Sequence, residues 1–453
     1  MLLDIVKNIM QTKKEQIQTR MMLLPPLEQL IPEDHPIRRL NRVLDLSFIH
    51  EAVREHYCQD NGRPSIDPEV VIRLFLLQAI EGIAHVRDLM RQVQVNLAYR
   101  WFIGYDIDEK LPDHSTLSRA LDRFGVEVFD ALFEQSIAQC KAKGLIEGKV
   151  LHVDATTIRA DLDKNRTGKD DSPDPDAQFG HFPDGTIQPG YKQQTVVDDS
   201  NRVVVGLSVS PANYTEGSDA IDAVDQAVKQ IGISPDIVCA DSAYASGENS
   251  AGFEERDIRF ISPPRLPRNG TGTQYFTIED FTYDEQRDVF ICPGGHILNN
   301  VGRMAGHPDR RKYRGSSLAC KQCKLKSCCT KASQRCVNVS IYYAFLVRLR
   351  TDRKTEAFKQ LYRSRAPSVE GVFAEAKQWH GLRRAWRRGL SKMRVQCLLI
   401  AAVINLKKLI GLFWLWNDSN MLYNVVIRAI IAFLRVIHPN KYKLVICETN
   451  VPE

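Results

Sequence analysis

The sequence predicts an α+β protein in which a helical N-terminal domain precedes a domain built on a mixed β-sheet. Residues 1–145 contain helix caps and helical periodicity, whereas short apolar runs rich in β-branched residues, typical of strands, begin after residue 146. Residues 264–340 hold most of the cysteines and predict an insertion that interrupts the sheet domain. With 453 residues, 43% of them hydrophobic and 26% charged, the chain has the composition of an ordinary soluble protein with a large core.

The N-terminal domain is predicted to consist of short helices joined by tight turns. Asp67-Pro68 provides an N-cap with proline at the first helical position, and residues 70–80 are apolar nearly all round, as in a buried helix. The segment Asp113-His114-Ser115-Thr116 offers caps for a second helix over 117–124, which Gly125 can end. Such an arrangement is compatible with a DNA-binding helical domain, and equally with a plain helical bundle.

Five strands are predicted for the sheet domain, at 150–158, 194–197, 203–209, 237–240 and 258–261, with a helix at 218–231. Three strands, a helix, two further strands and a late helix follow the order of a ribonuclease H-like fold, in which the first and fourth strands lie side by side. The domain then comprises residues 146–263 and 341–415, with a helical tail at 416–453. Asp, Pro and Gly are frequent between Asp163 and Gly190 and predict a long surface loop there.

Three acidic residues indicate a catalytic metal site. Asp154 lies in the first strand, Asp241 follows the fourth, and Glu370 lies in the helical stretch Pro367–Lys377. Mg²⁺ is usually held by one or two carboxylates together with substrate phosphates, and two such ions can clamp both oxygens of a phosphoryl displacement. The pattern indicates a metal-dependent enzyme that acts on a nucleic-acid backbone. The alternative is that each aspartate is a turn or cap residue, the commoner role at a strand end.

Charge is distributed unevenly, although the net charge is only +6. Residues 362–394 contain nine Lys or Arg against two Glu, and residues 301–326 contain eight against one Asp. Residues 154–199 reverse the balance, with ten Asp against five Lys or Arg. Acidic and basic regions together suit a site for metal and phosphate, although any single charged run can be a solvated face.

The helix that carries Glu370 is expected to continue into a basic stretch that binds DNA. Lys377 follows Glu370 by about two helical turns, so the two side chains share a face. Four arginines and an aromatic residue could grip the backbone and stack on an exposed base, namely Arg383, Arg384, Arg387, Arg388 and Trp379. Trp379 and Trp386 could equally pack in the core. His380 is expected to have a structural or phosphate-binding role rather than to act as a catalytic base.

The cysteines of the insertion predict a structural Zn²⁺ site. Cys320 and Cys323 form a Cys-x₂-Cys pair, and the preferred ligand set adds Cys292 and Cys329, with Cys328 as the competitor for the last place. Four thiolates around Zn²⁺ could hold together an insertion too small to fold by itself. A redox role for the pair is the lesser alternative, because no thioredoxin-like βαβ pattern surrounds it.

No secretory signal is visible in the first twenty residues, where lysines and an arginine interrupt any apolar core. The apolar stretches 397–416 and 421–437 are broken by charged residues and fall short of an uncharged membrane span of ~18 residues. We therefore expect no membrane association and a cytoplasmic location, with nucleoid association on DNA binding. Disulfide bonds are not expected among the eleven cysteines.

The order of several motifs resembles that of bacterial insertion-sequence transposases of the DDE superfamily, which place a helical N-terminal domain before a ribonuclease H-like catalytic domain. The matching segments span nearly the whole chain and include residues 30–36, 68–102, 112–118, 152–156, 190–192, 211–213, 240–244 and 370–390. Some of these transposases also carry a cysteine-bearing insertion between the second Asp and the Glu. The resemblance implies cleavage of double-stranded DNA at the element's terminal inverted repeats and transfer to target DNA, by a homodimer on the DNA.

The resemblance also assigns roles to individual residues. It makes Asp154, Asp241 and Glu370 the catalytic ligands of two Mg²⁺ (or Mn²⁺) ions, and Tyr362 and Arg365 DNA-binding residues beside Lys377. The interval from Arg365 to Glu370 is one residue longer than the family's usual pattern. Two alternatives remain open at this point: a metal-dependent nuclease on the same fold, and a non-catalytic DNA-binding descendant, against which the intact acidic residues argue.

Overall fold

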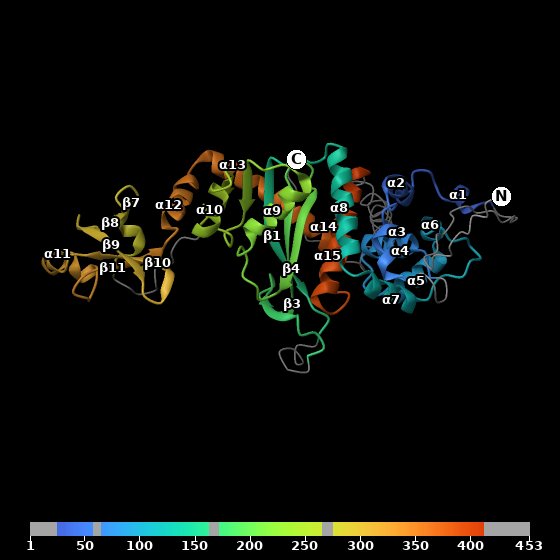
Figure 1. Cartoon of the computed structure of the whole chain (residues 1–453), viewed down its shortest axis with the longest axis horizontal. Coiled ribbons are helices and arrows are strands. Elements are labelled where there is room, and N and C mark those ends of the chain that lie inside the picture. Colours follow the sequence, from blue (N-terminus) through green and yellow to red (C-terminus); the bar gives the residue numbers. More distant parts are fainter. Residues whose placement is uncertain (1–24, 58–64, 163–171, 265–274, 412–453) are drawn as a thin grey trace, which may run out of the picture.

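The computed structural model describes residues 25–57, 65–162, 172–264 and 275–411. These residues form an elongated molecule, with the N-terminal helices at one end, a central sheet with its helices, and the cysteine-bearing insertion at the other end (Figure 1). The expected helical tail at 416–453 lies outside the described residues. Of the helices that are described, none combines the length and apolar character needed to span a membrane.

The N-terminal domain is helical from its first described residues. Its elements are α1 Leu27–Leu30, α2 Pro36–Val43, α3 Ile49–Ala52, the 3₁₀ turn Arg54–His56, α4 Pro68–Glu81, α5 Val86–Val95, α6 Leu97–Phe102, α7 His114–Phe124 and α8 Glu127–Ala142. The prediction of a buried helix is confirmed in α4, where the Asp67 side chain accepts a hydrogen bond from the Glu69 amide. Helix α7 begins three residues earlier than expected, because Asp113 caps it through the Ser115 amide.

The central sheet contains the five predicted strands and one that was not predicted, β2. Its strands are β1 Val150–Arg159, β2 Gln178–His181, β3 Ile187–Asp198, β4 Val204–Pro211, β5 Ile237–Ala240 and β6 Arg259–Ile261. They run in the order β2-β3-β1-β5-β6, and β4 also pairs with β3. Strand β1 is antiparallel to β3 and parallel to β5, and β5 is parallel to β6. The first and fourth predicted strands, β1 and β5, are therefore neighbours, and the domain is a mixed-sheet α+β fold.

The region expected to be a long surface loop is partly a strand ribbon. Strand β2 pairs with the first residues of β3, which begins at Ile187 rather than at residue 194. Gly190 permits this packing because a Cβ there would lie 2.3 Å from the Ile158 carbonyl oxygen. Composition predicted a loop because Pro and Gly are frequent, but the pairing of β2 with β3 supplies the backbone hydrogen bonds that composition does not reveal.

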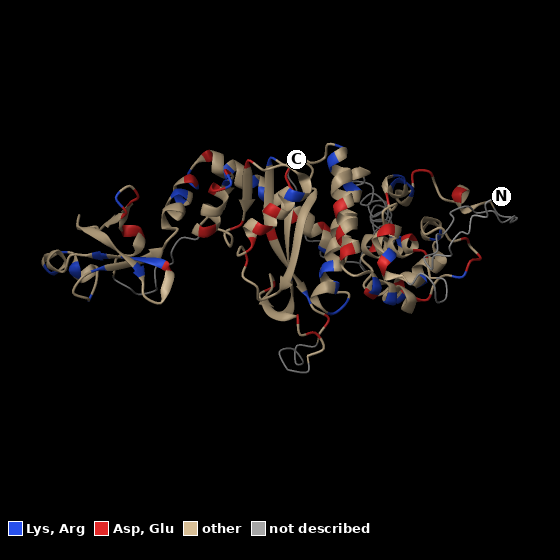
Figure 2. Ribbon diagram, in the orientation of Figure 1, with Lys and Arg blue, Asp and Glu red and all other residues tan. Residues whose placement is uncertain are grey.

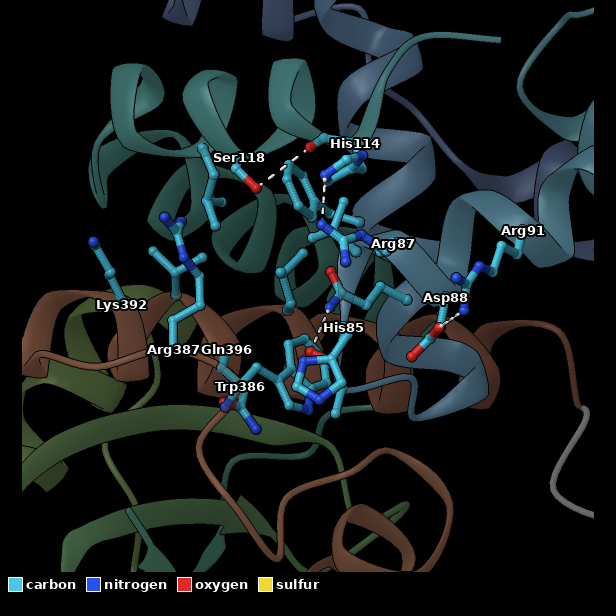
Figure 3. A pocket seen from close by; sticks show the side chains of 17 residues that line it. His85, Arg87, Asp88, Arg91, His114, Ser118, Trp386, Arg387, Lys392 and Gln396 are labelled. Carbon is cyan, nitrogen blue, oxygen red and sulfur yellow. Dashed lines mark hydrogen bonds and ion pairs between the residues drawn. The ribbon is translucent and has the colours of Figure 1, made fainter. Parts of the chain in front are cut away.

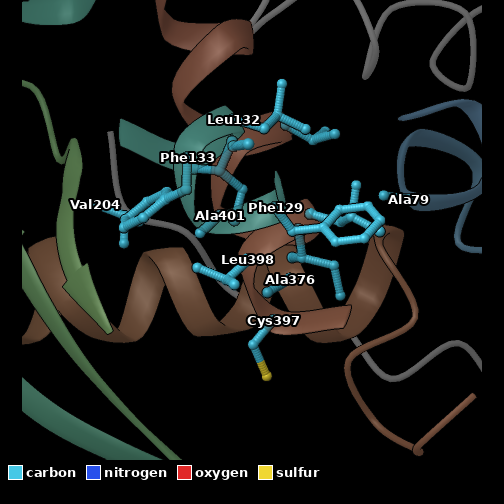
Figure 4. Packing of buried hydrophobic residues seen from close by; sticks show 14 of the residues in the cluster. Ala79, Phe129, Leu132, Phe133, Val204, Ala376, Cys397, Leu398 and Ala401 are labelled. Carbon is cyan, nitrogen blue, oxygen red and sulfur yellow. The ribbon is translucent and has the colours of Figure 1, made fainter. Parts of the chain in front are cut away.

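Helices cover the sheet and join it to the N-terminal domain. Helix α9 Ala220–Ile231 packs on β3 and β4, while α10 Gly247–Glu254 contacts β6. After the insertion come α12 Tyr343–Asp352, α13 Glu356–Arg365, a π-turn Ala366–Glu370, α14 Gly371–Trp379 and α15 Leu390–Leu409. Helix α15 packs against α8, β4 and α4, and in Figure 4 its Leu398 and Ala401 meet Phe129 and Phe133 of α8. One continuous core therefore spans the N-terminal and sheet domains.

The insertion forms a second, separate sheet. It contains a 3₁₀ turn Ile278–Asp280, β7 Thr282–Asp284, β8 Val289–Ile291, β9 Ile297–Met304, β10 His307–Gly315, α11 Ser317–Gln322, a 3₁₀ turn Lys326–Cys328 and β11 Cys336–Ser340. The strands are ordered β11-β10-β9-β8-β7. The insertion was expected to have little core of its own, and its core is a small one of seven buried residues, namely Phe281, Phe290, Leu298, Tyr313, Val337, Val339 and Tyr343.

A buried polar joint fixes the N-terminal domain against α14 and α15. The fully buried His380 ring lies with Nδ1 2.9 Å from the Ala79 carbonyl oxygen at the end of α4 and Nε2 3.2 Å from Lys407 Nζ. Lys407 in turn forms an ion pair with Glu375. Beside this joint Gly82 has a φ of +63°, and a Cβ there would lie 2.6 Å from the Trp379 carbonyl oxygen. His380 thus has the structural role expected of it.

Replacing Glu375 with Ala should lower the free energy of unfolding by about 3 kcal/mol, because it leaves the buried Lys407 ammonium without this carboxylate. Burial by itself raises the pKa of Glu375, but the His380 hydrogen bond and the Lys407 charge outweigh burial and hold the pKa at about 2, below the ordinary 4.5. This stabilisation is therefore present above about pH 4.5 and is lost as the pH falls toward 2. Urea denaturation of the full chain at several pH values measures both effects.

The matched control is Glu356→Ala, which removes an exposed glutamate that pairs with Lys359 one turn away. This control should leave the unfolding midpoint unchanged. Equal unfolding midpoints for the two variants at neutral pH would show that the Glu375–Lys407 pair does not stabilise the fold.

Candidate active site

Strand pairing brings the two predicted catalytic aspartates to adjacent positions. Val153 of β1 pairs with Ala240 of β5, and Asp154 and Asp241 are the next residues on the two parallel chains. Both carboxyl groups are partly buried, and the Asp154 side chain is 15% exposed. Burial raises the pKa of Asp154 to about 6; the Arg365 guanidinium opposes this shift and the Asp241 carboxylate adds to it. Two carboxylates in one partly buried place create an electrostatic demand for a cation.

The guanidinium group of Arg365 links Asp154 to Glu370. Its Nη1 donates to Asp154 Oδ2 at 2.7 Å and its Nη2 donates to Glu370 Oε1 at 3.2 Å. The Arg365 side chain is only 9% exposed, so the bridge is largely withdrawn from solvent at the Asp154 end, while Glu370 remains 59% exposed. Arg365 thus occupies the space between two of the three predicted metal ligands.

A π-turn explains how Arg365 and Glu370 meet. They are five residues apart, which in a regular α-helix would place them ~140° apart around the axis. Residues Ala366–Glu370 instead form a π-turn with Pro367 in its first positions, and this wider turn takes up one extra residue. The interval that is one residue longer than the family pattern is therefore accommodated in the backbone, and the two side chains still reach one another.

The π-turn is anchored to the sheet by residues that the sequence did not single out. Ser368 donates from Oγ to Asp199 Oδ1 at 2.8 Å, and the same carboxylate oxygen lies 2.7 Å from His152 Nε2. His152 is fully buried two positions before Asp154 on β1, and Val369 is fully buried as well. Period-two alternation places His152 and Asp154 on one face of the strand, which is the sequence signal that could have revealed this contact.

Lys377 and Tyr362 complete the surroundings of the bridge. The Tyr362 ring packs on Phe358, and the Arg365 guanidinium carbon lies over it, 5.6 Å from the ring centre. Burial lowers the pKa of Lys377, with Arg383 and Arg159 adding to the shift and Asp154 opposing it. Lys377 therefore lies within electrostatic reach of Asp154, on the helix that continues from Glu370.

The predicted basic helix after Lys377 is wrong, because α14 ends at Trp379 and residues 380–389 form a connecting segment before α15. Arg384 and Arg387 bind Asp161 and Asp122, each at 2.9 Å, and Arg388 donates to the Asp161 carbonyl oxygen. Arg383 is exposed and donates only to the Lys377 carbonyl oxygen among the contacts of the described residues. Gly381, with a φ of +72°, turns the chain here.

Two concavities flank this connecting segment. A cavity of about 440 Å³ lies between α14 and the end of α4, and is lined in part by Lys377, Trp379 and Arg383. A second of about 440 Å³ separates α5 and α7 from α15. Figure 3 shows Arg387 and Lys392 facing Arg87 and His114 across it.

Trp379 and Trp386 are both half-buried, and Trp386 also packs against the core. Both cavities thus lie between N-terminal helices and the chain that follows Glu370, and we call the basic residues that line them the basic rim, namely Arg87, Arg91, Lys377, Arg383, Arg384, Arg387 and Lys392.

The four predicted zinc ligands lie near one another in the insertion. A Cβ on Gly294 would lie 3.3 Å from Cys323 Sγ and 3.7 Å from Cys292 Sγ. Burial raises the pKa of Cys329, and Cys292, Cys320 and Cys323 add to that shift. Cys328 is exposed, whereas Cys329 is half-buried. Every described cysteine is a free thiol.

In neither candidate metal site do the side chains, in their present positions, surround one point at which an ion could bind. Over the described ranges, no three His, Cys, Asp or Glu side chains converge closely enough to hold an ion. For the acidic residues the geometry gives a reason: Arg365 stands between Asp154 and Glu370.

Two family models match the chain. Residues 25–123 match a transposase domain (DUF772), and residues 291–410 match a transposase DDE domain. The transposase domain match thus covers helices of the N-terminal domain. The transposase DDE match covers most of the insertion and the helices that follow it in the same chain. The chain is a transposase of the DDE type. The second match contains Glu370 and the four cysteines, whereas Asp154 and Asp241 lie outside both ranges, so their assignment rests on the geometry described above.

Solved structures of transposases show only remote similarity. The piggyBac transposase synaptic complex with hairpin DNA is 11% identical, with 91% of this chain and 84% of that chain covered and a TM-score of 0.35. The Mos1 transposase paired-end complex with the left transposon end is 10% identical, with 46% and 63% covered and a TM-score of 0.17. No curated protein matches the sequence.

The contact between Arg365 and Asp154 should appear as a coupling energy. In a double-mutant cycle of Arg365→Ala and Asp154→Asn, the two changes in free energy of unfolding should deviate from additivity by on the order of 1 kcal/mol or more, because the partners share one buried ion pair. Urea denaturation in chelator-containing buffer provides the four values. Arg365→Ala combined with Asp184→Asn, an exposed partner of Arg159, is the control and should be additive. Additivity in both cycles would show that the bridge does not form in solution.

Proposed function

We propose that this transposase cleaves DNA at the ends of its element and joins them to target DNA, with Asp154, Asp241 and Glu370 as the catalytic carboxylates. The observation that carries the proposal is the Arg365 bridge, in which a cationic group already connects Asp154 with Glu370 beside Asp241. Transposases with this domain generally use divalent metal ions.

The donor set fits hard divalent cations. Asp154, Asp241 and Glu370 offer only carboxylate oxygens, which Mg²⁺ and Mn²⁺ prefer, and the guanidinium between two of them is a stand-in cation. When bound, such ions would supply charge stabilisation to both oxygens of an in-line displacement at phosphorus. Cleavage and joining are both displacements of this kind, so one site can serve both steps.

The chain's own residues bind and orient the DNA around this site. Lys377 is placed to donate hydrogen bonds to a phosphate beside the carboxylates, and so is Arg365 once it is released from Asp154. Arg383 and Arg384 lie exposed at the neighbouring cavity, where Trp379 offers a ring on which an unpaired base could stack. Arg387 belongs to the basic rim and Arg388 extends it, although their present contacts with Asp122 and the Asp161 carbonyl must yield to phosphate.

The partner is double-stranded DNA, in the form of the terminal inverted repeats and the target, and a homodimer on the DNA would hold two ends together. Acting on chromosomal DNA places the protein in the cytoplasm, at the nucleoid. A plain nuclease would share the same carboxylates but would release its products unjoined, so an assay that scores joined DNA separates the two activities.

Substitution of Asp154, Asp241 or Glu370 by Ala should abolish cleavage and joining of labelled DNA that carries the element's own ends. Binding of that DNA should persist, because affinity is carried mainly by Lys and Arg at phosphates. Asp184→Ala, an exposed aspartate at the tip of the β2–β3 turn, is the control and should leave both activities intact. Cleavage that survives in any of the three variants would remove that residue from the site.

We also propose that Cys292, Cys320, Cys323 and Cys329 hold one structural Zn²⁺. The electrostatic effect of Cys292, Cys320 and Cys323 on Cys329 and the closeness of two sulfurs to Gly294 support this ligand set. Four thiolates at Zn–S of about 2.3 Å leave no open position, so the ion would stabilise the insertion without taking part in the chemistry.

Purified protein should contain one zinc per chain by metal analysis, and Cys320→Ser should lose the zinc and lower the thermal stability of the insertion. Cys328→Ser, which changes an exposed neighbour, is the matched control and should retain the zinc. Full zinc content in Cys320→Ser, or zinc-free wild-type protein, would refute the site.

A further inference from the structure

One face of the sheet in the insertion is open and basic. Tyr313 of β10 points into the core, as do Val337 and Val339 of the neighbouring β11. Strand alternation therefore turns Arg310, Lys312 and Arg314 to the opposite side. We call these three residues the basic sheet face. Arg310 and Arg314 are exposed and Lys312 is half-buried.

Among the residues that the structure describes, no acidic side chain balances this face. The residues of β11 that pair with Arg310, Lys312 and Arg314 are Ser340, Asn338 and Cys336, all without formal negative charge. Arg310 approaches the exposed Asp309 only to 3.9 Å, a contact worth little in water. Within the described part of the chain, Lys312 and Arg314 form no salt bridge. By contrast Arg311, on the core side of the same strand, pairs with Asp288.

The spacing of the three cations matches a DNA strand. Alternate residues of a strand are ~6.6 Å apart, because each residue advances ~3.3 Å. Successive phosphates of one strand of duplex DNA rise ~3.4 Å along the axis and also turn around it, so they lie roughly 7 Å apart in space. The pairing of β10 with β11 runs without a register shift from Arg310 to Arg314, and the irregularities of β10 lie on its other edge, in the pairing with β9.

We infer that the basic sheet face is a second DNA-binding surface, which holds the backbone of one strand through about three successive phosphates. The inference rests on the proposed function, because it extends the path of the DNA whose cleavage is assigned to Asp154, Asp241 and Glu370. Side chains on an open sheet face that reach only phosphates carry no sequence information, so this contact adds affinity and register rather than base recognition.

The location of the face suits a DNA duplex longer than the catalytic site. In Figure 1 the β7–β11 sheet lies beyond α10 and α12, at the end of the molecule opposite to the N-terminal helices. Basic residues colour β10 blue in Figure 2, while the strands of the central sheet are mostly uncharged or acidic. DNA that reaches both the carboxylates and the insertion would be held at two separate places, which fixes its direction across the site.

The test is the salt dependence of DNA binding by the full chain, with a duplex that carries the element's end. Each phosphate contact contributes ~0.9 to the slope of log affinity against log salt, so the triple variant Arg310→Ala, Lys312→Ala, Arg314→Ala should be shallower by up to ~2.7. Between 50 and 200 mM salt it should accordingly lose up to ~40-fold less affinity than the wild type. The charge-retaining variant Arg310→Lys, Lys312→Arg, Arg314→Lys should keep the wild-type slope.

The matched control removes three exposed or half-buried lysines of the same insertion that lie off the sheet, Lys321→Ala, Lys324→Ala and Lys326→Ala. An equal loss of slope in this control would attribute the effect to general charge and overturn the inference, as would an unchanged slope in the first variant. Loss of self-association with an unchanged slope would assign the face to a second copy of the chain instead. If the carboxylate variants still cleave DNA, the catalytic assignment is refuted. The salt slopes would still test DNA binding by the basic sheet face.

Discussion

A single guanidinium group between two carboxylates organises the candidate active site. Asp154 is partly buried next to Asp241, and burying like charges together is unfavourable unless a cation compensates them. Arg365 supplies that cation and at the same time reaches Glu370 from the other side. Because Arg365 and Glu370 belong to one continuous helical segment, the ion pair also fixes how that segment lies on the sheet. A metal ion that replaces the guanidinium would meet ligands that are already near one another.

Contacts on three sides hold the helical segment that carries Arg365 and Glu370 in place. Ser368 and His152 converge on Asp199 and attach the π-turn to the sheet, while Phe358 and Tyr362 of α13 pack beside β5 and β6. Farther along, the Glu375–Lys407–His380 joint ties α14 to α15 and to the end of α4. The position of Glu370 therefore depends on the packing between the N-terminal and sheet domains, although no residue of the N-terminal domain touches the carboxylates in the described contacts.

Much of this arrangement could be predicted from the sequence, because it follows from local patterns. Two apolar runs predicted β1 and β5, and their order predicted that Asp154 and Asp241 would be neighbours. The π-turn could not be predicted, since Ala366–Glu370 fits an ordinary helix by composition and the widening shows only in long-range contacts such as Arg365 with Asp154. The basic stretch was expected to continue the helix of Glu370, whereas Gly381 and the tight approach to Gly82 end α14. Strand β2 was missed because its partner residues in β3 lie among Pro and Gly.

The central claim is that Asp154, Asp241 and Glu370 form one metal site from which Arg365 must move. Anomalous diffraction from crystals of the protein with element-end DNA and Mn²⁺ tests it most directly. The account predicts manganese bound by the carboxylates of all three residues, with the Arg365 guanidinium displaced from Asp154 toward a phosphate. Manganese bound elsewhere, or Arg365 still bridging Asp154 and Glu370 while the ion is present, would contradict it.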